Sequence, residues 1–134
     1  MKTGKRILCG CVVSLCCLTM AGCELFLAGT AAGIGMYSYA NGELSRSYQI
    51  GYDEALEICT DVLEKQDIRI TETEAKSLST LIRSEYYNGK PVTVKVTRQD
   101  TDMTEISIRS GITGVWDREF SEQIHAGIAK QIQR

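Results

Sequence analysis

The chain has 134 residues, with 15 Lys and Arg against 17 Asp and Glu and a formal net charge of −2 at pH 7. This length suits one modest domain and excludes a large multidomain protein. The slightly acidic balance lacks the basic footprint of a general nucleic-acid-binding protein, so we expect no nucleic acid among its partners.

The first 22 residues have the organisation of an export signal. Such a signal starts with positive charge, continues through an apolar run and ends in small residues before the cleavage site. Three cations, an uncharged run and two small residues follow this order and are succeeded by a cysteine: Lys2, Lys5, Arg6, residues 7–20, Ala21, Gly22 and Cys23.

An ending in small-small-Cys resembles the lipobox of bacterial lipoproteins, although Met20 stands where that family prefers Leu. The resemblance implies that the chain is cut before Cys23 and that Cys23 carries the acyl chains, so the membrane is a partner through them. Two or more acyl chains hold a protein stably at a bilayer. The alternative is an uncleaved membrane segment at 7–40 in which Cys23 has no role.

The residue after the lipidated Cys indicates which membrane. In the enterobacterial lipoprotein sorting pattern, an Asp at that place signals retention in the inner membrane. Glu24 stands there instead. We therefore expect the bacterial cell envelope, with the outer membrane, facing the periplasm, favoured over the inner membrane.

Cleavage before Cys23 changes the meaning of the composition. It leaves 112 residues, twelve basic against seventeen acidic, and two of the six cysteines, Cys23 and Cys59. A disulfide framework is therefore not expected. The acidic balance also argues against attraction to anionic lipid headgroups.

Residues 25–40 are uncharged and rich in Gly and Ala. Small-xxx-small spacings, which let membrane helices approach closely, make Gly29, Gly33 and Gly35 candidate membrane-packing residues. The run is shorter than the roughly 20 residues of a spanning helix. We favour an apolar tether at the bilayer surface over a partly inserted helix, and both over a full span. The expected organisation is a signal peptide at 1–22, the lipidated Cys and tether at 23–42 and a soluble domain at 43–134.

Hydrophobic periodicity and turn residues predict seven elements in the soluble domain. They are a strand at 43–50, a helix from about 53 to 66, a strand opening at 68–70, strands at 80–87, 92–97 and 103–109, and a helix from 115 or 117 to 132. Polar residues 71–76 and 99–102 predict turns, and 111–114 a loop. Asn88-Gly89 between two β-rich runs predicts a hairpin, because both turn positions need positive φ.

Clean alternation along the strands predicts one wet sheet face and one covered face. The order is β-α-β-β-β-β-α, which gives an α+β two-layer sandwich with an antiparallel sheet and two helices on one face. Cys59 falls in the apolar arc of the first helix, where we expect an inert structural thiol rather than a reactive one. The last helix carries an apolar stripe that includes Trp116, Phe120, Ile124, Ile128 and Ile132.

Three motifs extend a resemblance over nearly the whole chain. Gly42-Glu43-Leu44, Arg46 and Tyr48 fit a GEL-x-R-x-Y pattern, residues 92–96 read VTVKV, and residues 104–111 read TEISIR-x-G. The chain resembles a family of small bacterial lipoproteins whose α+β domain has no known function and follows a lipobox and a Gly/Ala-rich stretch. The resemblance implies the fold and the anchor and no activity.

The residues that carry chemistry in enzymes are sparse, so we expect no catalytic site, cofactor or metal. His125 is the sole histidine, and we expect it to be structural and partly exposed at the edge of the apolar stripe. Glu122-x-x-His125 has the spacing of a di-iron half-site but lacks a second copy. Asp100, Asp102 and Glu105 lack the spaced ligands of a calcium loop and are expected in a solvated turn.

The wet sheet face is the candidate partner surface. Arg83, Glu85, Lys95 and Arg109, with Glu105, are expected to form cross-strand charge pairs there. A solvated face is favoured over a docking face. We expect a non-catalytic envelope lipoprotein that binds another envelope protein or component. The alternative is an enzyme or small-ligand-binding protein with its site between the sheet and the helix that contains Trp116.

Overall fold

The structure is a computed structural model and describes residues 37–134. The predictions for the signal peptide, the acylated Cys23 and the glycines at 29, 33 and 35 lie outside the described residues. Within the described part, two helices and seven strands follow one another as β1 Ser38–Ala40, β2 Glu43–Tyr48, α3 Tyr52–Lys65, β3 Ile68–Ala75, β4 Ser79–Tyr86, β5 Pro91–Asp100, β6 Met103–Ile112, β7 Val115–Trp116 and α4 Arg118–Ile132.

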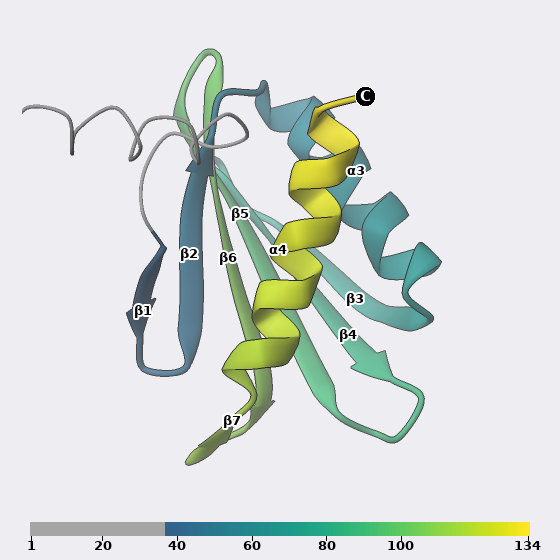
Figure 1. The fold of residues 1–134 in the computed structure, drawn as a ribbon. Coiled ribbons are helices and arrows are strands. Elements are labelled where there is room, and N and C mark those ends of the chain that lie inside the picture. Colours follow the sequence, from purple (N-terminus) through teal and green to yellow (C-terminus); the bar gives the residue numbers. More distant parts are fainter. Residues whose placement is uncertain (1–36) are drawn as a thin grey trace, which may run out of the picture. The chain divides into compact units, whose positions relative to one another are not determined.

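The strands form one antiparallel sheet in the order β1-β2-β6-β5-β4-β3, and β7 pairs with the end of β6. Strands β3 to β6 are a meander, because each pairs with the next in sequence. β2 pairs with β6 on the far side of the meander, so α3 carries the chain across the sheet from β2 to β3. Figure 1 shows this crossing and the course of α4 over the sheet.

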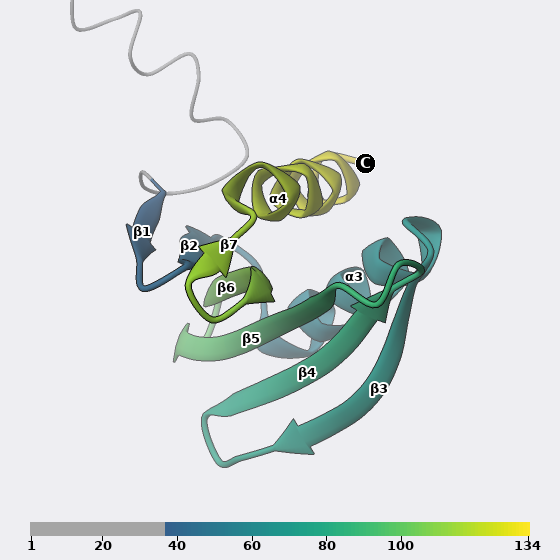
Figure 2. The same ribbon diagram turned by 90° about the horizontal axis from the view of Figure 1, so that it is seen from below.

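Both helices cover the same face of the sheet (Figure 2), which confirms the predicted α+β fold. The register places the inward side chains of four strands in one row: Leu44, Ile108, Val94 and Ile82. All four side chains are buried, and Ile108, Val94 and Ile82 belong to one apolar core with residues of both helices, among them Leu63, Ile124 and Ile128. Burying this apolar surface is the main stabilising contribution to the fold.

The helix ends follow ordinary capping chemistry. Asp117 precedes α4 and its carboxylate accepts a hydrogen bond from the Phe120 backbone N–H at 2.9 Å. Gly51 is the N-cap residue of α3 and makes no side-chain cap, while Asp53 and Glu54 lie in the first turn, where acids interact well with the helix dipole.

One segment predicted as a turn and one predicted as a loop extend the sheet instead. Residues 71–75 continue β3, with a bulge between Ile70 and Glu72. Their polar side chains are stabilised by β4, since Glu72 and Glu74 both pair with Arg83. β6 runs on to Ile112, where the sequence predicted a loop, because the chain turns back at once to form β7.

The prediction that Trp116 belongs to the last helix is wrong. Trp116 lies in β7 opposite Gly111, and the helix begins at Arg118. Gly42 has φ +79°, and its missing Cβ leaves the space that the Trp116 ring occupies. The tryptophan therefore packs on the β1–β2 turn instead of the helical core.

Residues 38–40, which the sequence assigned to the tether, form β1 and pair with β2. The strand is three residues long and exposed, and its alternation is too short to be recognised in an uncharged run. Within residues 37–134, no helix is long and apolar enough to cross a membrane.

Candidate functional site

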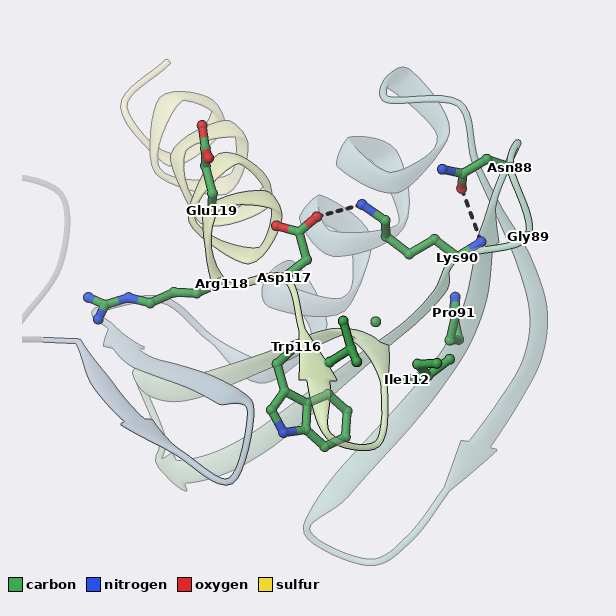
Figure 3. A pocket seen from close by; sticks show the side chains of 11 residues that line it. Asn88, Gly89, Lys90, Pro91, Ile112, Trp116, Asp117, Arg118 and Glu119 are labelled. Carbon is green, nitrogen blue, oxygen red and sulfur yellow. Dashed lines mark hydrogen bonds and ion pairs between the residues drawn. The ribbon is translucent and has the colours of Figure 1, made fainter.

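An open groove lies at the end of the sheet where β5 begins and β6 ends (Figure 3). It has a volume of about 580 Å³. We call it the sheet-end groove and define it by its lining residues, which come from the β4–β5 turn, the β6–β7 hairpin and the start of α4: Asn88, Gly89, Lys90, Pro91, Gly111, Ile112, Val115, Trp116, Asp117, Arg118 and Glu119.

An ion pair ties two walls of the groove together. Lys90 Nζ lies 2.5 Å from Asp117 Oδ2, and both side chains are about two-thirds buried. The hydrogen bond from Lys90, together with the one from the Phe120 amide, holds the pKa of Asp117 below its usual range. Asp117 is therefore ionised at neutral pH, and it caps α4 and positions Lys90 at once.

The apolar side chains of the groove are exposed to solvent. Ile112 and Val115 oppose each other in the β6–β7 hairpin and are 62% and 69% exposed. Most large apolar side chains of the domain are buried, so these two exposed neighbours form a small apolar patch at the hairpin.

Core side chains fill the space between the sheet and α4. Ile124 and Ile128 are fully buried there. The alternative hypothesis placed a site between the sheet and a helix containing Trp116, but Trp116 lies in β7 and lines the sheet-end groove.

A buried polar pair connects β2 with α4. Tyr48 Oη lies 2.8 Å from His125 Nδ1, and His125 Nε2 lies 2.9 Å from the Leu44 carbonyl oxygen. A carbonyl only accepts, so Nε2 carries the hydrogen and Nδ1 accepts from the tyrosine. Burial lowers the pKa of His125 to about 4, against its ordinary 6.5.

The prediction of a partly exposed His125 is wrong: the side chain is fully buried. The periodicity placed His125 beside the apolar stripe, but it did not show that Tyr37, just before β1, and Tyr48 of β2 pack against its ring. The Tyr37 ring lies edge-on to the His125 ring, with 5.3 Å between the ring centroids, and the Tyr37 hydroxyl accepts a hydrogen bond from Arg46. Glu122 instead accepts a hydrogen bond from Arg118, so the Glu-x-x-His spacing builds no common site.

The expected burial of Cys59 is confirmed. The side chain is 1% exposed, and burial raises the pKa of its thiol to about 12. No group of three His, Cys, Asp or Glu side chains within 37–134 is placed to hold a metal ion.

The predicted partner-face residues share the uncovered side of the sheet. Arg83, Lys95 and Arg109 lie on the neighbouring strands β4, β5 and β6. Thr93 of β5 is the ladder partner of both Arg83 and Arg109, and Lys95 is the partner of Ser107. Arg83 and Glu85 form the expected cross-strand charge pairs, but with residues of β3 and not with one another. Arg83 pairs with Glu72 and Glu74, and Arg69 pairs with Glu85, because β3 supplies the opposite charges.

Sequence reasoning missed the groove residues Lys90, Ile112 and Val115. Gly111 and Gly114 were a signal for a tight return of the chain, since both have positive φ. The ion pair had no sequence signal, because Lys90 and Asp117 are brought together only by the pairing of distant strands.

Comparison with known proteins gives a family and no activity. No curated protein matches the chain. A family described as "Protein of unknown function (DUF3568)" matches residues 6–131, which is most of the chain. The protein therefore belongs to the DUF3568 family.

Proposed function

We propose that the protein is a lipid-anchored protein of the bacterial cell envelope, held at the membrane by acyl chains on Cys23. The observation that carries this proposal is the order of cations, apolar run and Ala21-Gly22-Cys23 at the start of the chain. The family match supports it, because it begins at residue 6, inside the proposed signal peptide, and continues to residue 131.

We further propose that the domain is a binding or structural module without catalysis. The two side chains best suited to nucleophilic or acid–base chemistry, His125 and Cys59, are both buried. Both ring nitrogens of His125 have protein partners, and the raised pKa of Cys59 keeps its thiol protonated at neutral pH. A reactive cysteine needs an accessible thiolate.

The periplasmic face of the outer membrane is the proposed location, since Glu24 replaces the Asp of the inner-membrane retention pattern. The wet sheet face around Lys95 is the proposed partner surface for an envelope protein. Fractionation of the two membranes tests the location, and photo-cross-linking from position 95 tests the surface.

Metabolic labelling with a tagged fatty acid tests the anchor. Wild-type protein should carry the label and have the mass of a chain lacking residues 1–22, while Cys23→Ser should lose both features. Cys17→Ala is the matched control, because it removes a thiol that leaves with the signal peptide. Equal label on the wild type and on Cys23→Ser would refute the anchor.

A small-ligand-binding protein is the second candidate, favoured by the sheet-end groove. Its volume of about 580 Å³ lies in the usual range of ligand pockets. Trp116 is the sole tryptophan of the chain and lines the groove, so its emission reports binding directly. Titration with a panel of small amphipathic molecules should shift this emission, and Lys90→Met should weaken the response. No shift with any member would count against this candidate.

A further inference from the structure

The β6–β7 hairpin presents two aliphatic side chains to solvent at one end of the domain. Ile112 and Val115 face each other across this hairpin, and both are more than half exposed. The turn between them contains Gly114 at φ +87°, so the hairpin is tight and the two side chains are held together at its tip. We call this pair the apolar tip.

The surroundings of the apolar tip are those of a membrane-interface contact. Trp116 follows it directly, and Tyr87 of the neighbouring β4–β5 turn is 81% exposed. Aromatic side chains favour the headgroup region because one part of the ring system is apolar and another polar. Lys90 and Arg118 lie in the same groove.

The charge of this end does not select anionic lipid. Lys90 is paired with Asp117, and Arg118 is paired with Glu122. With both cations neutralised by neighbours, the attraction comes from apolar surface. A neutral phosphatidylcholine surface is therefore sufficient.

The chain between the anchor and the domain is long enough for this contact. Residues 24–36 separate Cys23 from Tyr37. Thirteen residues reach at most about 45 Å when fully extended. The ten residues of β5 span about 33 Å, so either end of the sheet comes within reach of the bilayer. A tethered contact needs little intrinsic affinity, because tethering raises the effective concentration of the second site.

We propose that the apolar tip, with Trp116 behind it, rests in the headgroup region of the bilayer to which the protein is anchored. This inference depends on the proposed anchor at Cys23. It fixes the orientation of the domain: the sheet end that holds the groove faces the lipid, and the β3–β4 turn at the opposite end of the strands points away.

Quenching of Trp116 tests this orientation in the complete protein. The acylated chain is reconstituted in phosphatidylcholine vesicles whose acyl chains carry bromine near the headgroup, and Trp116 emission is compared with that in unbrominated vesicles. The variant is Ile112→Ser/Val115→Ser. Leu78→Ser is the matched control, since Leu78 is 63% exposed in the β3–β4 turn. Circular dichroism checks that all three chains are folded.

Bromine should quench the wild type and the Leu78→Ser control equally, and the double variant should lose at least about half of the quenching, because the apolar area that drives insertion is gone. Unquenched Trp116 in acylated, vesicle-bound protein would overturn the proposal. So would equal quenching of wild type and double variant. A cross-linker attached at position 112 that joins two copies of the chain, in the absence of Trp116 quenching, would overturn the proposal and show that the tip contacts a second copy. Failure of the anchor is seen separately, as a chain without acyl mass.

Discussion

His125 is held neutral by its surroundings. It is fully buried, and its ring donates to the Leu44 carbonyl and accepts from Tyr48. Arg46 disfavours a second positive charge nearby. The imidazole therefore acts as a polar link that satisfies one backbone carbonyl of β2 and one hydroxyl inside the apolar layer, which is what a buried polar group requires.

Tyr48→Phe should lower the free energy of unfolding by about 1–3 kcal/mol, because His125 Nδ1 then stays buried without a donor. Urea unfolding at pH 7.5 measures the change. Tyr52→Phe is the matched control: its hydroxyl bonds Thr80 at 2.6 Å but is only partly buried. We expect a smaller loss there, and equal losses would show that the Tyr48–His125 bond has no special weight.

Acidification should destabilise the domain through His125. The folded-state pKa is about 4 and the ordinary value 6.5, so the unfolded chain takes up a proton that the folded chain refuses. The stability that comes from keeping His125 neutral in the folded state is fully present above pH 6.5 and is lost as the pH falls towards 4. The loss is about 1 kcal/mol at pH 5.5 and about 3 kcal/mol at pH 4.

Urea unfolding between pH 7.5 and 5.5 checks this prediction before most carboxyl groups titrate. His125→Asn removes the only histidine and should flatten the profile in that window, although it lowers the stability at every pH. The same slope in wild type and variant would mean that another group is responsible.

At the scale of elements, Gly42 of the β1–β2 turn packs against Trp116 of β7. Gly42 has φ +79°, a conformation that costs other residues energy, and a Cβ there would overlap the Trp116 ring. The Arg109 guanidinium lies 5.5 Å from the centre of the same ring. Trp116 is thus held between a turn and a cation of the wet sheet face.

Gly42→Ala should destabilise the domain by about 2–4 kcal/mol, which combines the cost of positive φ with displacement of the indole. Gly114→Ala is the matched control, because Gly114 has φ +87° and nothing within 4 Å of an added Cβ. It should cost only about 1 kcal/mol, the conformational part. Thermal unfolding followed by circular dichroism compares the two. Equal costs would show that the indole moves freely.

At the scale of the whole molecule, one apolar core within residues 37–134 includes residues of both described helices and of five strands. Trp116 is not part of that core. Its fluorescence therefore reports on the groove and on the β1–β2 turn around Gly42. In the sequence, β7 lies between β6 and α4, and both of these elements contribute residues to the core. The chain therefore connects the sheet end directly to the core on both sides.

We therefore expect a single cooperative unfolding transition in the described domain. Trp116 fluorescence and far-UV circular dichroism should give the same urea midpoint, as is usual for domains of this size. An earlier fluorescence transition would show that the β6–β7 hairpin and the groove open before the core unfolds. Ile112→Ser/Val115→Ser should leave both midpoints nearly unchanged, since these side chains are mostly exposed.

Local patterns in the sequence determined the fold class. Alternation in residues 92–97 and 103–109, the hairpin signal at Asn88-Gly89 and the apolar arcs of two helices each depend on neighbours along the chain, so they are readable without tertiary contacts. The turn geometry expected of that hairpin is wrong, because Gly89 has φ +80° but Asn88 does not have positive φ. The N-terminal signal pattern that motivates the proposed anchor at Cys23 is likewise readable without tertiary contacts. A short peptide segment is sufficient for recognition by processing enzymes.

Contacts between residues far apart in the sequence determined the features that local patterns did not predict. Residues 71–75 became strand because β4 supplied both backbone partners and the Arg83 charge. His125 was buried because β2 lay beside α4 and brought Tyr48 to it. Lys90 lies beside Asp117 because β5 and β7 both pair with the end of β6. Such contacts join residues far apart in sequence, and their free energy depends on burial and geometry that no local pattern contains.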